Sequence, residues 1–255
     1  MTPDTLRAAA ARAIACLDLT SLNDDDTDAI IAELCARAVT PAGPVAAVCV
    51  YAPFVAQCRR ALEGSGVKIC TVVNFPHGRE DAASVAVETR AAVADGADEI
   101  DVVLPYQAWL SGRHAAARAV LDAAREATGD RTLKVILETG RLMTTGAIVS
   151  AATVAIEAGA DFLKTSTGKT PVAATLESAH LLLDCAVGAG RPVGVKVAGG
   201  VRNTAQDAAY LRLADRVLGG TATPDRFRFG ASGLLRDLLT TLGQSAAGPA
   251  ARSGY

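Results

Sequence analysis

Three of the five lysines in this chain, Lys134, Lys164 and Lys196, lie within short apolar runs that are typical of buried strands. The chain otherwise carries its positive charge on twenty arginines. Arginine keeps its proton in a protein, whereas a buried lysine can lose it. A neutral amine in an apolar setting attacks a carbonyl carbon to form a Schiff base. The pattern therefore predicts covalent amine chemistry on an aldehyde or a ketone.

Short runs rich in apolar and β-branched residues recur along the chain, mostly about thirty residues apart, which is the length of one strand-and-helix unit. Such units close into a single-domain α/β fold, the (β/α)8 or TIM barrel, which we expect over residues 1–243. An open doubly wound sheet is the alternative, but its Gly-x-Gly-x-x-Gly turn does not follow the first run. The predicted strands are Ile14–Leu19, Val45–Val50, Lys68–Asn74, Glu99–Leu104, Leu133–Thr139, Asp161–Lys164, Val193–Val197 and Arg226–Gly230. The predicted helices include Glu80–Asp95, His114–Thr128, Thr145–Ala158, Leu176–Val187 and Thr204–Leu213.

The composition narrows the partners that this chain could have. Its net charge is −2 with acids and bases interspersed, so no nucleic-acid partner is expected. No uncharged apolar run reaches the length of about eighteen residues that a membrane span needs, and the first residues lack a signal-peptide pattern, so we expect a cytoplasmic protein. Six cysteines without a Cys-x-x-Cys spacing predict small buried hydrophobic side chains in a reducing compartment. Alanine-rich helices permit a homodimer, and residues 244–255 are expected to form a flexible tail that ends in Tyr255.

Ionisable residues occur at the ends of several predicted strands. In a barrel, catalytic groups come from the carboxyl ends of the strands and from the loops that follow them. Buried charges are costly unless they are paired, so packing alone does not explain a group of them at one mouth. The candidates are Asp18 and Thr20 on the first strand, Asp101 on the fourth, Lys134 and Glu138 on one face of the fifth, Lys164 on the sixth and Lys196 on the seventh.

Each candidate also has a purely structural interpretation. Asp101 alone is equally well explained by pairing with a neighbouring lysine. Lys134 lies deeper than Glu138 and could be a buried ion-pair partner of Asp18 or Asp101. Glu138 is better explained as an ordinary acid at the start of a loop. Lys68 lies at the start of its strand, the wrong end for catalysis.

Lys164 and Lys196 lie on neighbouring predicted strands, and this arrangement can activate one of them as a nucleophile. The positive charge of one lysine lowers the pKa of the other, so that a fraction of it is neutral at about pH 7. The spacing alone does not decide which lysine is the nucleophile. The hydroxyls of Thr165, Ser166 and Thr167 could hydrogen-bond a carbinolamine, which favours Lys164 as the nucleophile and Lys196 as the perturbing ammonium.

Three neighbouring loops predict a phosphate site. Exposed amides at the start of a helix bind phosphate, and barrels commonly hold phosphate in the loops after strands seven and eight. Each glycine pair on its own could simply form a turn. The predicted phosphate-binding residues are Gly168 and Lys169 after strand six, Gly199 and Gly200 after strand seven, and Ser232 and Gly233 after strand eight.

The three histidines do not predict a metal site. His114 and His180 fall in helical segments, and His77 alone at the end of a strand does not make a zinc site. We therefore expect no metal, and we expect no organic cofactor because a lysine Schiff base does not need one.

In these residues the chain closely resembles the deoxyribose-phosphate aldolases, a family of class I Schiff-base aldolases, over nearly its whole length. The motif Lys-Thr-Ser-Thr-Gly-Lys at 164–169 is highly specific. The other stretches that carry the resemblance are Leu17–Thr27, Val73–Gly78, Ala97–Tyr106, Leu133–Gly140, Val195–Arg202 and Arg228–Ser232.

The resemblance implies a role for each candidate. Lys164 corresponds to the Schiff-base lysine, Lys196 to the residue that lowers its pKa, and Asp101 to an acid/base that works with an ordered water. Asp18 and Lys134 match supporting polar positions, and Gly168, Lys169, Gly199, Gly200 and Ser232 match the phosphate pocket. Tyr255 matches a terminal tyrosine that, in some bacterial relatives, folds back over the site to assist proton transfer.

The activity that the resemblance implies is the reversible cleavage of 2-deoxy-D-ribose 5-phosphate into D-glyceraldehyde 3-phosphate and acetaldehyde, in deoxyribose phosphate catabolism. Gly233 departs from the family pattern, because relatives often have a second serine there, and we expect a weakened preference for phosphate. Another Schiff-base aldolase and a non-catalytic barrel that binds a sugar phosphate are the alternatives.

Overall fold

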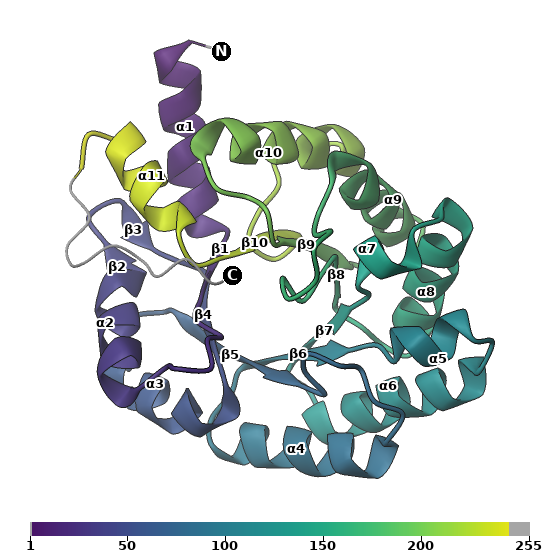
Figure 1. The fold of residues 1–255 in the computed structure, drawn as a ribbon. Helices are drawn as coiled ribbons and strands as arrows, with labels where there is room; N and C mark the ends of the chain where they lie inside the picture. The colour runs from purple at the N-terminus through teal and green to yellow at the C-terminus, as the bar shows by residue number, and fades with distance from the viewer. Residues whose placement is uncertain (1, 245–255) are drawn as a thin grey trace.

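The computed structural model describes residues 2–244, and its centre is a closed barrel of eight parallel strands (Figure 1). Around the ring the strands are ordered β1-β10-β9-β8-β7-β6-β5-β4, so strands that follow one another in sequence are neighbours in space. A two-stranded hairpin of β2 (Val39–Thr40) and β3 (Gly43–Pro44) lies outside the barrel. The barrel strands are β1 Leu17–Thr20, β4 Ala47–Val50, β5 Lys68–Val73, β6 Glu99–Val103, β7 Thr132–Ile136, β8 Phe162–Lys164, β9 Gly194–Ala198 and β10 Phe227–Ala231.

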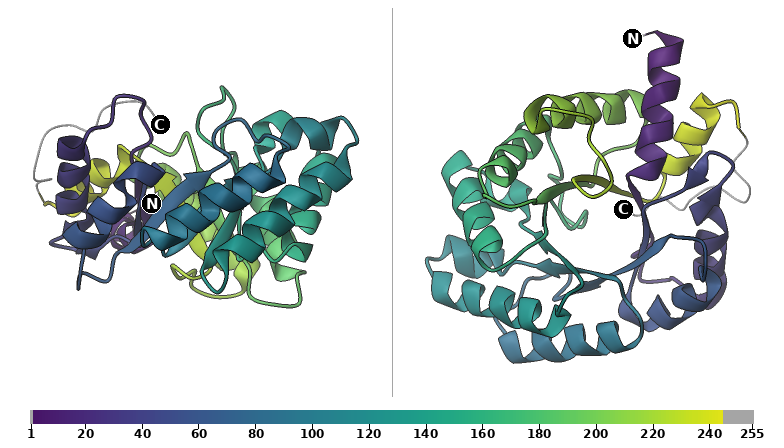
Figure 2. Two further views of the ribbon diagram at one scale, coloured as in Figure 1. Left: turned by 90° about the horizontal axis from the view of Figure 1, so that it is seen from below. Right: turned by 180° about the vertical axis from the view of Figure 1, so that it is seen from behind.

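Helices form an outer ring around the strands, as the two further views also show (Figure 2). This arrangement is the (β/α)8 barrel that the thirty-residue period predicts. Short helices α5 and α7 follow β6 and β7 on the way to the longer covering helices. The helices are α1 Pro3–Ala15, α2 Asp28–Ala38, a 3-10 turn Ala52–Phe54, α3 Val55–Ala61, α4 Ala82–Ala94, α5 Tyr106–Leu110, α6 His114–Thr128, α7 Thr139–Leu142, α8 Thr145–Glu157, α9 Leu176–Val187, α10 Thr204–Leu218 and α11 Leu234–Thr241.

Three predicted boundaries are wrong for local reasons. The first strand does not begin at Ile14, because the residues up to Ala15 continue α1, which Thr2 caps at its start. The fifth strand ends at Ile136, because Glu138 has a left-handed backbone (φ 57°) that an extended strand does not allow. Helix α10 continues past the predicted end and stops at Gly219, which takes the left-handed conformation typical of a helix end.

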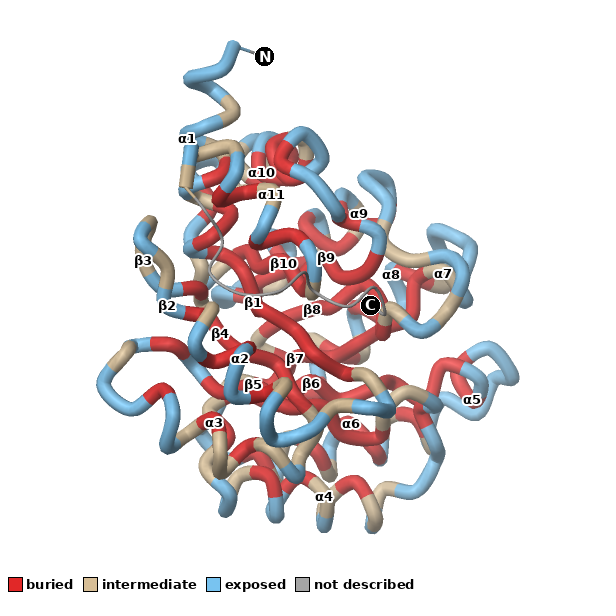
Figure 3. Tube along the Cα trace, turned by 60° about the vertical axis from the view of Figure 1, so that its left-hand side comes forward, coloured by how far each residue is buried: buried red, intermediate tan, exposed pale blue. Residues whose placement is uncertain are grey.

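The strands are buried on both faces, and the exposed residues concentrate on the outer helices (Figure 3). Strands covered by helices outside and by side chains inside need apolar residues on both faces, which explains their nearly continuous apolar runs. The largest fully buried side chains nevertheless include three lysines, Lys134, Lys164 and Lys196. In residues 2–244, no helix has both the length and the hydropathy needed to cross a bilayer.

Candidate active site

The parallel register brings the predicted lysines side by side. Lys164 of β8 is the Cα partner of Lys196 of β9, and Lys196 is in turn the partner of Arg228 of β10. On the other side of the ring, Asp101 of β6 pairs in register with Lys134 of β7. Side chains at paired positions point to the same face of a sheet, and in this barrel the shared face is the interior.

Asp101 is the centre of the buried charges. One carboxylate oxygen, Oδ2, accepts hydrogen bonds from both Lys164 Nζ and Lys196 Nζ, each at 2.8 Å. The other oxygen, Oδ1, accepts from Lys134 Nζ at 2.9 Å and from the thiol of Cys70 at 3.1 Å. Because Asp101 and the three lysines have no exposed surface, these bonds lie outside the reach of solvent screening.

A second set of charges extends the cluster around the barrel. Asp18 of β1 contacts Lys196 Nζ at 2.6 Å and Arg228 Nη1 at 2.7 Å. Glu99 contacts Lys134 Nζ at 2.6 Å and Arg228 Nη2 at 3.1 Å. The guanidinium of Arg228 also lies 5.6 Å from the centroid of the Phe162 ring.

Gly230 makes room for this arrangement. A Cβ atom at Gly230 would lie 3.0 Å from Cε of Lys196 and 3.1 Å from Cβ of Ala198. A side chain there would push the Lys196 amine away from its carboxylates. A glycine is therefore needed at this position of β10 so that the Lys196 side chain fits, and not only because a turn follows.

The cluster holds most of its members firmly ionised. Burial alone would raise the pKa of Asp101, but Lys134, Lys164 and Lys196 outweigh burial and hold that pKa well below its usual range. Burial also opposes the charge on Lys134 and Lys196, yet the surrounding carboxylates, Asp101 above all, hold the pKa of both amines well above the ordinary value.

Four cations face three carboxylates in this cluster: Lys134, Lys164, Lys196 and Arg228 against Asp18, Glu99 and Asp101. When all seven groups are ionised, one positive charge is in excess. Uncompensated charge inside a protein is expensive, so the cluster favours the loss of one proton. Arginine does not give up its proton, so among these seven groups the proton must come from a lysine.

The structure brings together Asp18, Asp101, Lys134, Lys164 and Lys196 as one cluster. Both partners suggested for Lys134 are present, since its amine lies 2.9 Å from Asp101 and 3.9 Å from Asp18.

Thr20 is buried at the end of β1, where its hydroxyl donates to the backbone carbonyl of Asp18. Lys68 is exposed at the start of β5, as predicted. Tyr255 lies outside the described residues.

Sequence reasoning missed two members of the cluster, Glu99 and Arg228. Glu99 precedes Asp101 by two residues in the same strand, and that spacing places both side chains on one face. Arg228 precedes Gly230 by the same interval. Among twenty arginines, however, Arg228 had no feature that separated it from a surface cation.

Glu138 does not have the role of an ordinary acid at the start of a loop. It has no exposed surface, and its carboxylate accepts hydrogen bonds from the backbone N–H and the hydroxyl of Thr167 and from the hydroxyl of Thr170. Glu138 therefore holds the loop that follows the Lys164 strand. This is also why it does not continue β7 on the face of Lys134, as the spacing of four predicted.

The hydroxyls after Lys164 divide into two groups. Thr165 bonds the backbone of Ala198, and Thr167 bonds Glu138, so both tie the β8 loop to neighbouring strands and loops. Ser166 is fully buried, and its hydroxyl has no partner within residues 2–244. Ser166 is therefore the member of the three that is free of a structural bond and could donate to a bound intermediate.

The predicted phosphate residues lie in the loops after three adjacent strands, β8, β9 and β10. A Cβ atom at Gly199 would lie 3.3 Å from the Gly168 Cα atom, so the first two loops touch. Gly233 is exposed at the start of α11, which is eight residues long and has no side-chain cap. Lys169 reaches across the mouth and donates to the Leu22 carbonyl at 2.6 Å.

Two thiols lie beside the charges. Cys49 of β4 and Cys70 of β5 are register partners, and Lys134 donates to the sulfur of Cys70 at 3.3 Å. The two sulfurs and an Asp101 oxygen lie within 4.8 Å of one another, a spacing that soft metal ions accept. The same Asp101 is bound by three lysine amines, and the charges of Lys134 and Lys196 oppose a cation at this place.

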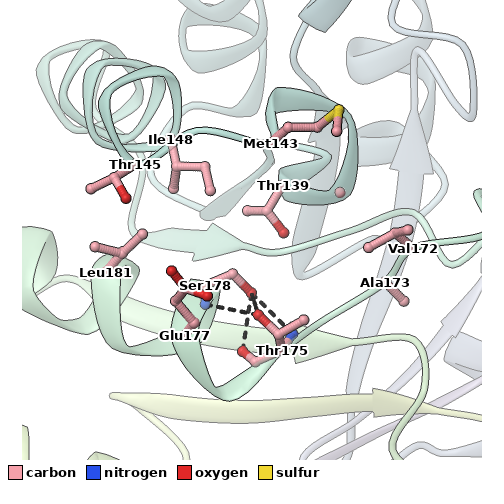
Figure 4. A pocket seen from close by; sticks show the side chains of 11 residues that line it. Thr139, Met143, Thr145, Ile148, Val172, Ala173, Thr175, Glu177, Ser178 and Leu181 are labelled. Atoms are coloured by element: carbon pink, nitrogen blue, oxygen red, sulfur yellow. Dashed lines mark hydrogen bonds between the residues drawn. The ribbon is translucent and has the colours of Figure 1, made fainter.

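A separate cavity of about 230 Å³ lies behind the β8 loop, between α7, α8 and the start of α9 (Figure 4). Its walls are made by apolar side chains such as Met143 and Ile148 and by hydroxyls such as those of Thr139 and Ser178. None of its lining residues is a lysine or belongs to the charged cluster, so this cavity is distinct from the place where the lysine chemistry would occur.

The barrel fold and the buried lysines at its centre indicate an aldolase-type barrel. The comparison with known families agrees. The chain belongs to the DeoC/LacD family of aldolases, whose family model matches residues 12–236. It is therefore an enzyme of the lyase class.

Solved structures give the same result. A protein from Toxoplasma gondii ME49 that carries the provisional name deoxyribose-phosphate aldolase is 26% identical, with a TM-score of 0.86, over 95% of this chain and 97% of that one. The deoxyribose phosphate aldolase of Aeropyrum pernix, described as tetrameric, is 25% identical with a TM-score of 0.73 over 95% and 98%. An aldolase named QR15 is 30% identical with a TM-score of 0.74 over 89% and 96%.

Proposed function

We propose that this aldolase catalyses the reversible cleavage of 2-deoxy-D-ribose 5-phosphate into D-glyceraldehyde 3-phosphate and acetaldehyde, through a Schiff base on Lys164. The observation that carries the proposal is the Asp101 oxygen that Lys164 shares with Lys196. This geometry supports the proposal because the expected nucleophile, the expected perturbing cation and a carboxylate that could accept a proton lie within hydrogen-bond reach of one another. The names of the Toxoplasma and Aeropyrum proteins support the substrate.

Lys164 is the lysine that we expect to lose the excess proton of the cluster. Lys134 contacts Asp18, Glu99 and Asp101, and Lys196 contacts Asp18 and Asp101, so both amines are strongly held in the charged form. Repulsion from these two neighbouring ammonium groups favours the neutral amine at Lys164. Lys196 is thus the perturbing cation, and Lys134 supports it by keeping Asp101 ionised.

In the cleavage direction, the neutral Lys164 amine attacks the C1 aldehyde of the substrate. Asp101 accepts a proton and, with a water molecule, returns it as the carbinolamine loses water to give the protonated imine. The protonated imine withdraws electrons from the C2–C3 bond, which breaks as the C3 hydroxyl loses its proton. The enamine of acetaldehyde that remains is protonated at C2 and hydrolysed from Lys164.

No metal or organic cofactor is needed for this reaction, because the iminium withdraws electrons as a Lewis acid would. Gly168, Gly199, Gly200, Ser232 and Gly233 would bind the phosphate through their backbone amides and the serine hydroxyl. Lys169 would exchange its bond to the Leu22 carbonyl for the phosphate. Cytoplasmic deoxyribose phosphate catabolism is the corresponding cellular role, and a homodimer remains a prediction.

The decisive experiment is to mix the protein with acetaldehyde and borohydride, and then to measure the intact mass and map the peptides. We expect a single two-carbon adduct on Lys164 in the wild type and none in Lys164→Ala. An adduct on Lys196 would keep the chemistry and exchange the roles of the two lysines. Folded protein without an adduct would leave the non-catalytic sugar-phosphate barrel as the better hypothesis.

Donor specificity separates this proposal from the other Schiff-base aldolases. The protein is incubated with D-glyceraldehyde 3-phosphate and, in turn, acetaldehyde, dihydroxyacetone or pyruvate. We expect a product only with acetaldehyde. A preference for either of the other donors would keep Lys164 but assign a different aldol reaction.

A further inference from the structure

The thiols of Cys49 and Cys70 face one another inside the barrel and are not used by the mechanism above. The two residues are direct register partners on β4 and β5, and both side chains have no exposed surface. Neighbouring strands lie about 4.8 Å apart, which is within the Cα separation of roughly 4.4–6.8 Å that disulfides use. The spacing of the two strands is therefore within the range that a disulfide uses, and the two sulfurs, which are free thiols in this structure, lie within 4.8 Å of one another.

The surroundings of the two thiols differ in a way that suits stepwise oxidation. The neighbouring Cys70 thiol lowers the pKa of the Cys49 thiol, with further help from the Lys196 charge. Burial, and then the neighbouring Cys49 thiol and the charge of Asp101, raise the pKa of Cys70, whose proton is donated to Asp101. Cys49 is thus the thiol that more readily becomes a thiolate, the reactive form, and Cys70 keeps its proton beside it.

Access to the pair is no more restricted than access to the proposed nucleophile. Lys164 is as fully buried as the two cysteines, and both Lys164 and Cys70 bond the carboxylate of Asp101. A small molecule that reaches Lys164 through the mouth of the barrel is therefore separated from Cys70 by the Asp101 carboxylate alone. This holds for a small hydroperoxide as it does for an aldehyde.

We propose that Cys49 and Cys70 are a site of reversible oxidation, at which a hydroperoxide converts the two thiols into a disulfide and thereby switches off the lysine site. The Cys49 thiolate attacks the peroxide, so that a sulfur–oxygen bond forms, the oxygen–oxygen bond breaks, and the leaving oxygen takes up a proton to give an alcohol or water. The Cys70 sulfur then attacks Cys49, the disulfide forms, and hydroxide leaves with the Cys70 proton as water. Two electrons pass from the thiols to the peroxide.

The disulfide would act on the site through Asp101 and Lys134. Closing the sulfurs to about 2.05 Å removes the proton that Cys70 donates to Asp101 and draws its sulfur away from the Lys134 amine. The Asp101 oxygen that loses the Cys70 bond keeps its bond from Lys134, and it is on the same carboxylate that Lys164 and Lys196 share. The regulatory part of this inference rests on the proposed function, whereas the disulfide itself does not.

A second facing pair provides a matched control. Cys35 of α2 and Cys58 of α3 are also buried and share a hydrogen bond, but they lie on the outer helices. Oxidation of that pair should leave the lysine site unchanged. Cys70→Ala removes the inner pair, and Cys58→Ala removes the outer pair by a similar loss of volume.

The experiment treats the reduced protein with hydrogen peroxide, blocks the remaining thiols after denaturation, and maps disulfide-linked peptides without reduction. In parallel, borohydride trapping of acetaldehyde on Lys164 is measured for each variant relative to its own reduced form. We expect a Cys49–Cys70 link in the wild type and in Cys58→Ala, at least a tenfold loss of trapping that follows the extent of linkage, and recovery with dithiothreitol. We expect neither the link nor a comparable loss in Cys70→Ala.

Three results would overturn the inference. The first is the absence of the Cys49–Cys70 link in oxidised wild type, and the second is a complete link with undiminished trapping. The third is an equal loss of trapping in Cys70→Ala, which would assign the effect to oxidation of Cys49 alone. A link in a protein that traps no acetaldehyde even when reduced would instead contradict the proposed function and leave the disulfide established.

Discussion

Lys164 and Lys196 donate to the same atom, Oδ2 of Asp101, and each bond measures 2.8 Å. Two amines that share one carboxylate oxygen are near neighbours, so the charge of one is felt directly by the other. In the low dielectric of the barrel interior this effect is much stronger than it would be at the surface. The arrangement yields the following predictions.

Replacement of Lys196 by Met should impair the reaction at neutral pH and spare it at alkaline pH. Without the neighbouring ammonium, Lys164 keeps its proton, so we expect activity at about pH 7 to fall by roughly one to two orders of magnitude and to recover in part as the pH rises. The measurement is the pH–rate profile of deoxyribose 5-phosphate cleavage. Lys68→Met, on the exposed opposite end of the barrel, is the control and should match the wild type. An unchanged profile in Lys196→Met would remove its role as the perturbing cation.

Glu99→Gln and Arg228→Met should move the acid limb of the pH–rate profile in opposite directions. The first removes a carboxylate and increases the excess of positive charge, so that a lysine proton leaves more easily and the limb moves to lower pH. The second removes a cation and balances the cluster, so that the limb moves to higher pH. Glu99→Gln is expected to lose about 3–5 kcal/mol of stability because it adds to the uncompensated buried positive charge, and Arg228→Met less, because Asp18 and Glu99 keep Lys196 and Lys134 as partners. Shifts in the same direction would contradict the charge balance that we describe.

Asp207 should make the protein less stable as the pH rises. It is fully buried on α10, both of its carboxylate oxygens lack a partner within residues 2–244, and burial and the charge of Asp237 raise its pKa to about 8. Below the ordinary value of 3.8 the group is neutral in the folded and unfolded chains, whereas above about 8 it is charged in both. Stability is therefore lost progressively between these two values.

Asp207→Asn removes this dependence, because the amide is neutral at every pH. We expect little difference from the wild type in urea unfolding at about pH 4 and a gain of up to about 5 kcal/mol at about pH 8.5. Asp184→Asn, on the exposed surface of α9, is the control and should be close to neutral at both values. A gain of equal size at both values would show that the effect of Asp207 is packing rather than charge.

Gly233→Ser should strengthen the preference for phosphorylated substrates. No atom lies within 4 Å of the place that a Cβ would take, and φ of −94° is ordinary for serine, so the side chain is accommodated. The added hydroxyl stands at the start of α11 beside Ser232. We expect a lower KM for deoxyribose 5-phosphate and little change for deoxyribose. Equal changes for both sugars would place Gly233 outside the phosphate site.

The sequence was sufficient for the barrel and for much of the cluster because both depend on local spacing. The period of about thirty residues predicts the strand-and-helix units, and strand position alone places Lys164, Lys196 and Asp101 inside the barrel. Lateral register is different, because it depends on how the ring closes. The register that sets Arg228 beside Lys196, and so completes the charge balance, cannot be read from any one strand.

The backbone conformation of Glu138 is another feature that could not be predicted from its own strand. Its spacing from Lys134 predicts a shared strand face, and this prediction fails because the chain turns into the left-handed region at φ 57°. What stabilises this conformation is the set of bonds to Thr167 and Thr170, about thirty residues further along. A backbone conformation that is stabilised by residues far along the chain is difficult to predict from the residues next to it.

Arg228 closes one end of the cluster with its guanidinium over the Phe162 ring and its bonds to Asp18 and Glu99. The guanidinium of Arg228 and the ring of Phe162 do not relay protons, because arginine does not release a proton and the ring has no exchangeable one. Protons therefore do not reach the lysines through Arg228 or Phe162. A sugar phosphate that fills the mouth would separate the cluster from bulk water. Until the ligand leaves, the reaction would have to be completed with the protons that are already in the site.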